Sequence, residues 1–110
     1  MFFVVYSFHV IKGKEASFES SWKKLTEMIY THANSNGSRL HKSKGNEYIA
    51  YASWPDKKTW EDGASRLPKG SEVFSKKMKD CCSNIQTVYE LDMVNDLLKK
   101  NNKNEYSRIL

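Results

Sequence analysis

The first extended segment of the chain, residues 2–11, has apolar side chains on both of its faces. Alternate positions of a strand point to opposite sides. One face therefore holds Phe2, Val4, Tyr6, Phe8 and Val10. The other face holds Phe3, Val5, Ser7, His9 and Ile11. We expect a strand of this composition to be covered on both sides.

The apolar spacing then changes to that of a helix and later returns to strands. A stripe over residues 15–33 predicts one buried helix face, made of Phe18, Trp22, Leu25 and Ile29. Turn residues then separate a predicted hairpin, 38–42 and 47–54, from a short helix that Asp56 caps. A further helix begins at Ser71 and a last strand spans 84–94. Its alternation predicts an inner face of Ile85, Thr87, Tyr89, Leu91 and Met93.

This order of elements, strand, helix, strand, strand, helix, strand, predicts an α+β fold. It is the ferredoxin-like βαββαβ arrangement, a four-stranded antiparallel sheet with its helices on one face. The other face of such a sheet is uncovered. Exposing either side of the first strand would leave an apolar patch, because even the side with Ser7 and His9 holds Phe3, Val5 and Ile11. Soluble monomers seldom expose a large apolar patch, so we expect a homodimer in which two sheets pack face to face.

The 110 residues match one domain. We predict that it spans residues 1–95 and that a polar tail spans 96–110. The net charge is +5, but the lysines are scattered along the chain, so neither nucleic acid nor a membrane is an expected partner. The N-terminal residues resemble a strand more than a signal peptide. Adjacent Cys81 and Cys82 indicate reduced thiols, and we expect a cytoplasmic protein.

Three segments resemble the antibiotic biosynthesis monooxygenase domain family, whose members form dimeric α+β barrels. The resemblance covers about residues 2–94 and is strongest in Phe18–Trp22, in Gly37–His41 and in Tyr48–Asp56 with Trp60 following. It implies a pocket in each subunit for a small aromatic or quinol-type molecule and the use of dioxygen without a cofactor. Haem-degrading members use asparagine, tryptophan and histidine where this chain has Tyr6, Gly63 and Met78. The resemblance therefore implies no haem.

Candidate site residues are mostly aromatic, because flat amphipathic side chains can enclose an aromatic ring. We predict that Tyr6 and His41 act as acid or base. The predicted substrate-binding residues are Arg39, whose guanidinium could also pair with Glu47 or Glu90, and Trp22, Tyr51, Trp54, Trp60 and Met78. The histidines are not spaced as metal ligands, so no metal site is expected.

Two functions are compatible with these residues. The first is a cofactor-independent monooxygenase acting on a small aromatic or quinol-type molecule between the sheet and the helices. The second is a homodimer of the same fold that binds a small molecule or serves a structural role without turnover. In the second reading the aromatic side chains fill the core, and the histidines form surface or interface hydrogen bonds.

Overall fold

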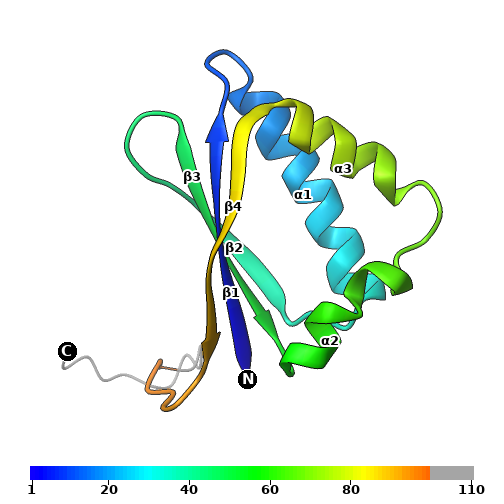
Figure 1. Ribbon diagram of the computed structural model, residues 1–110, viewed down its shortest axis with the longest axis vertical. Coiled ribbons are helices and arrows are strands. Elements are labelled where there is room, and N and C mark those ends of the chain that lie inside the picture. The colour runs from blue at the N-terminus through cyan, green and yellow to red at the C-terminus, as the bar shows by residue number, and fades with distance from the viewer. Residues whose placement is uncertain (100–110) are drawn as a thin grey trace.

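A computed structural model describes residues 1–99 of the chain as a four-stranded sheet with helices on one side (Figure 1). The strands are β1 (Phe2–Val10), β2 (Gly37–Lys42), β3 (Glu47–Trp54) and β4 (Cys82–Asp92). The helices are α1 (Glu15–His32), α2 (Lys57–Glu61), the 3₁₀ turn η1 (Gly63–Arg66) and α3 (Ser71–Asp80). The predicted tail falls mostly on residues 100–110, which lie outside the described residues, so its boundary stays a prediction.

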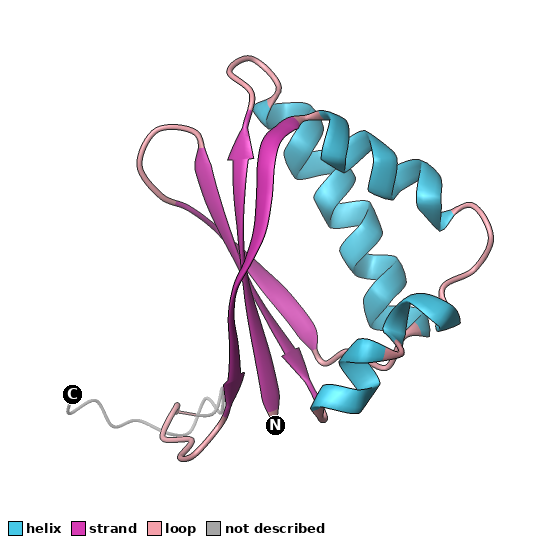
Figure 2. Ribbon diagram, in the orientation of Figure 1, coloured by secondary structure: helices cyan, strands magenta, loops and turns pink. Residues whose placement is uncertain are grey.

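The strands are arranged in the order β2-β3-β1-β4, and each neighbouring pair is antiparallel. The expected ferredoxin-like βαββαβ fold is therefore confirmed. Figure 2 shows all the helices on one side of the sheet, which leaves the opposite side, here called the open face, without helical cover. No helix of residues 1–99 combines the length and the hydropathy that a membrane span requires.

The main core lies between the sheet and helices α1 and α3. Phe18 of α1 is fully buried, and its ring lies 5.1 Å from that of Phe8 and 4.9 Å from that of Tyr48. The helix side of the sheet is buried at the alternate positions that the sequence predicts: Phe2, Val4, Phe8, Val10, Tyr48, Ala50, Ala52 and Trp54. Burial of large apolar side chains is the main stabilising term of a fold of this size.

The last strand departs from its predicted alternation at a β-bulge. Thr87 lies opposite Tyr6, but Tyr89 lies opposite Val5, so Val88 is an extra residue in β4. Directly opposite residues share a face of the sheet. The prediction that Tyr89 and Leu91 face inward with Thr87 was therefore wrong, and both lie on the open face.

The bulge also moves Glu90 to the helix side of the sheet. There its carboxylate lies 3.3 Å from the ammonium group of Lys57, in the first turn of α2. The change of face thus exchanges two apolar side chains, Tyr89 and Leu91, for two acidic ones, Glu90 and Asp92, on the helix side. It enlarges the apolar area of the open face.

Candidate functional site

The helix side of the sheet contains a chamber of about 290 Å³, lined by side chains of the sheet and of helices α1 and α3. Its floor is β3, where the small Ala50 and Ala52 leave the space that a larger side chain would occupy. Its walls are mainly apolar and include Phe8, Trp22, Leu25, Ile29, Met78 and Ile85. Ligand pockets usually measure about 300–1,000 Å³, so the volume suits a small flat ring system.

Trp54 supplies a polar group with no partner in this chamber. The residue is only 5% exposed, and its indole Nε1 forms no hydrogen bond with any described residue. Gly63 sets the position of the ring, because a Cβ atom there would lie 3.1 Å from Trp54 Cη2. A buried N–H without an acceptor costs about 1–3 kcal/mol. An acceptor atom of a bound molecule would remove that cost.

Tyr6 supplies a second donor to the chamber. The Asp56 carboxylate caps α2 by accepting a hydrogen bond from the Thr59 backbone N–H, at 2.8 Å, as the sequence predicts. The capped helix places Trp60 Nε1 where it donates to the Tyr6 hydroxyl at 2.9 Å. Because Tyr6 is the acceptor of this bond, its own proton is free for a second partner.

The Tyr6 hydroxyl is protonated at neutral pH. Burial raises its pKa, the hydrogen bond from Trp60 partly offsets this, and the nearby negative charge of Glu90 adds to the rise. The direction is the one expected when an anionic form is moved away from water. In this protonated state the Tyr6 hydroxyl can donate a hydrogen bond.

The described lining of the chamber contains neither a carboxylate nor a histidine. Besides Tyr6, Lys79 is the one ionisable side chain among its described lining residues. Within residues 1–99, no three side chains of the His, Cys, Asp and Glu types gather as a metal site. Trp54 and Tyr6 are two of several hydrogen-bond donors in the mainly apolar lining, which also includes Thr26, Ser75 and Lys79. The chamber is suited to a flat molecule with an oxygen acceptor.

The two adjacent cysteines do not form a reactive pair. Both are free thiols, and Cys81 Sγ donates to the Lys77 carbonyl at 3.2 Å. Burial, followed by the neighbouring Cys81, raises the pKa of Cys82 to about 11. A thiol with this pKa is not a nucleophile at neutral pH.

No protein-family model matches the sequence, and no curated protein matches it either. Solved structures do match. A mutant form of SnoaB, a cofactor-independent oxygenase from Streptomyces nogalater, has a TM-score of 0.73 at 18% identity, over 89% of this chain and 97% of that one. A candidate antibiotic biosynthesis monooxygenase from Bordetella bronchiseptica has a TM-score of 0.71 at 18% identity, over 86% and 97%. The chain has the antibiotic biosynthesis monooxygenase fold.

This fold is not confined to proteins named as monooxygenases. A NIPSNAP domain protein from Burkholderia xenovorans has a TM-score of 0.67 at 15% identity, over 92% of this chain and all of that one. The resemblance noted in the sequence is therefore confirmed at the level of the fold. Identities this low do not by themselves transfer an activity, because function depends on the residues of the site.

The structure brings five of the predicted site residues together and places three elsewhere. Tyr6, Trp22, Trp54 and Met78 line the chamber, and Trp60 reaches it through its hydrogen bond to Tyr6. The other three, Arg39, His41 and Tyr51, share the open face. Arg39 of β2 lies opposite Tyr51 of β3, and His41 lies opposite Ile49. No ion pair joins Arg39 to Glu47 or Glu90 within the described chain. The roles assigned to all eight residues stay predictions.

The open face has a hollow of its own, here called the tail groove, with a volume of about 800 Å³. It lies between the sheet and the segment that follows β4. Phe3, Arg39, Tyr51 and Leu91 line the sheet side, and residues 93–98 line the other. This hollow lies on the opposite side of the sheet from the chamber, and Ser38 of the edge strand β2 borders both.

Proposed function

We propose that the chamber binds a small aromatic or quinol-type molecule and that the protein is a cofactor-independent monooxygenase. The observation on which this rests is the mainly apolar chamber whose lining includes both Trp54, with its buried unpartnered N–H, and Tyr6. The fold adds support, since SnoaB, which shares it, is a cofactor-independent oxygenase.

The chemistry that suits these residues is stabilisation of an oxyanion on the substrate. An anthrone illustrates the reaction class: loss of a ring proton gives an enolate, which supplies electrons to dioxygen. One oxygen atom becomes a new carbonyl, the other leaves as water, and the anthrone becomes an anthraquinone. Trp54 and Tyr6 would donate to the enolate oxygen, which lowers the cost of forming it. The mainly apolar lining of the chamber strengthens such hydrogen bonds.

A second candidate function, binding without turnover, is favoured by one specific observation. The described lining of the chamber contains no carboxylate or histidine, and the raised pKa of Tyr6 is unsuited to a base. A protein with these features can hold an aromatic molecule without oxidising it. The two candidates share the chamber and differ only in whether dioxygen is consumed.

We also propose that the protein works in the cytoplasm as a homodimer. The free cysteines are compatible with a reducing compartment. The open face exposes Tyr51, Tyr89 and Leu91, and a second copy is the simplest cover for it.

Oxygen uptake by the pure protein tests the proposed activity. A panel of quinols and anthrones is supplied to the wild type and to Ala50→Leu, which adds bulk opposite Tyr6 on the chamber floor. The matched control is Ile49→Leu, the neighbouring position on the other side of β3. We expect the wild type and the control to consume oxygen and Ala50→Leu to lose activity. If no compound supports uptake but some bind, the non-catalytic function is correct.

A further inference from the structure

The apolar part of the open face is concentrated at one end of the sheet. Phe3 and Tyr51 stack there with their ring centroids 4.9 Å apart, and the bulge in β4 adds Tyr89 and Leu91. The other end is polar, with a Ser7 hydroxyl that donates to Glu47 at 3.0 Å. A contact that buries apolar surface on this face must therefore involve the Phe3 end.

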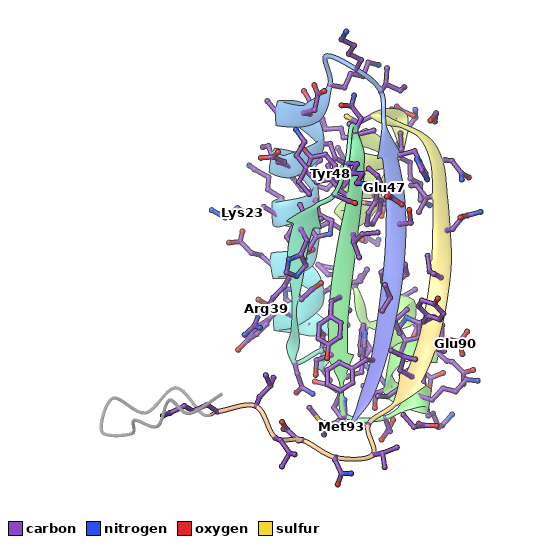
Figure 3. All side chains as sticks on the ribbon, turned by 90° about the vertical axis from the view of Figure 1, so that its left-hand side faces the viewer. Lys23, Arg39, Glu47, Tyr48, Glu90 and Met93 are labelled. Carbon is purple, nitrogen blue, oxygen red and sulfur yellow. The ribbon has the colours of Figure 1, made fainter. Side chains whose placement is uncertain are left out.

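The segment after β4, residues 93–98, borders this apolar end and exposes its own apolar side chains. The Met93 backbone N–H donates to the Met1 carbonyl at 3.0 Å, which fixes the start of the segment beside β1. Beyond it, Val94 is 88% exposed, Leu97 is 90% exposed and Leu98 is 75% exposed. Figures 1 and 3 show the segment on the side of the sheet that faces away from the helices. Within residues 1–99 these three side chains thus leave most of their apolar surface uncovered.

The footprint of the open face follows from the number and the length of its strands. Four strands spaced by about 4.8 Å and the nine residues of β1 at about 3.3 Å each give a face of roughly 19 by 30 Å, or about 570 Å². The apolar side chains of residues 94–98 lie next to this face and would supply additional area.

Charges of both signs border the tail groove. Arg39 forms no ion pair with another described residue, and Asp96 lines the same groove. In an isologous contact the same surface meets itself, so a surface that has both signs can pair each charge with its opposite on the other copy. This arrangement favours a second copy of the chain over an unrelated partner.

We propose that residues Val94–Leu98 form a clasp, in which each copy packs its Val94, Leu97 and Leu98 side chains against the partner copy at the tail groove. The clasp rests on the proposed homodimer and assigns a role to a segment outside the sheet. It completes the interface that the sheet provides only in part. Its removal weakens the dimer without disturbing the chamber, which lies on the other side of the sheet.

Sedimentation of the full chain at a series of micromolar concentrations tests the clasp. The clasp variant is Val94→Asn, Leu97→Asn and Leu98→Asn combined. The matched control is Val73→Asn, an exposed valine on α3, away from the open face. Leu91→Arg, on the apolar end of the sheet, tests the dimer itself. We expect the wild type and the control to sediment at twice 12.8 kDa.

The clasp variant should raise the dimer dissociation constant by about tenfold or more, and Leu91→Arg should dissociate the dimer. If the clasp variant matches the control while Leu91→Arg dissociates, the clasp is refuted and the dimer stands. A wild type that sediments as a monomer refutes both, and leaves the open face to another partner. Ligand binding by the clasp variant, measured with anthrone in the absence of oxygen, should equal that of the wild type. The proposed function is therefore tested separately.

Discussion

Replacing Trp54 by phenylalanine removes the unpartnered N–H of the chamber and keeps an aromatic ring on β3. The smaller side chain of the variant changes the contacts with every ligand. The loss of the N–H donor affects only ligands that have a hydrogen-bond acceptor. Two probes of similar shape separate the effects. Anthrone has a carbonyl oxygen, and 9,10-dihydroanthracene has a methylene group in its place.

The expected size of the effect follows from the burial of the indole. An intramolecular hydrogen bond to a neutral acceptor contributes about 0.5–1.5 kcal/mol net, and about 1.4 kcal/mol corresponds to tenfold in affinity. Trp54→Phe should therefore weaken anthrone binding by about two- to twelve-fold more than it weakens binding of 9,10-dihydroanthracene. In the wild type Trp54 is only 5% exposed, and its indole N–H has no hydrogen-bond partner. A ligand acceptor therefore does not compete with an acceptor from any described residue.

Isothermal titration calorimetry without oxygen measures both affinities in the wild type and in the variant. Trp22→Phe is the matched control, because Trp22 also lines the chamber but is not the residue with the buried unpaired N–H. We expect the selective loss for Trp54→Phe only. Equal losses for the two probes in Trp54→Phe would refute the assignment of Trp54 as the donor to the ligand.

Three further predictions concern the core. Tyr48→Phe should lower the free energy of unfolding, measured with urea, by about 1–2 kcal/mol, because it removes the 2.6 Å hydrogen bond from Tyr48 to Glu19. The control, Tyr30→Phe at an exposed position, should change this free energy by less than about 0.5 kcal/mol. Equal changes in the two variants would contradict the prediction. That hydrogen bond, followed by burial, raises the pKa of Tyr48 from 10.0 to about 12. The resulting stabilisation is complete below pH 10.0 and is lost as the pH rises towards about 12, so alkaline titration should destabilise the wild type more than Tyr48→Phe; parallel curves would show that Tyr48 is not responsible. Phe18→Ala should cost about 3–5 kcal/mol in the same urea assay, because the ring is fully buried against Phe8; a loss below about 1 kcal/mol would mean that the core is packed differently.

Local periodicity was sufficient to predict most of the fold. The strand at residues 2–11 and the helix stripe from Phe18 to Ile29 each depend on spacing within one segment, and both are present in the structure. The bulge at Val88 could not be predicted in this way. An extra residue in a strand shows only in its pairing with a neighbour, here with Val5 and Tyr6 of β1. Beyond it, the alternation inferred from β4 alone assigned Tyr89 to the wrong face.

The site was predictable only to the extent that its residues share a face. Alternation along β3 places Trp54 with the small alanines of the chamber floor, and the helix stripe adds Trp22. The same alternation puts Tyr51 on the opposite face, as the structure does, although its aromatic ring made it a candidate for the same pocket. The contact that positions the Tyr6 hydroxyl could not be seen in the sequence, because the hydrogen bond from Trp60 to Tyr6 joins residues that are 54 positions apart.

The most direct test of the account is a nuclear magnetic resonance titration of ¹⁵N-labelled protein with anthrone in the absence of oxygen. The chain has three tryptophans and therefore three indole N–H signals, which substitution assigns one by one. The account predicts that the Trp54 signal moves downfield as its N–H gains an acceptor, while the Trp60 signal, already bonded to Tyr6, moves less. A Trp54 signal that stays unchanged at saturating anthrone would contradict the claim that this chamber binds the ligand through Trp54.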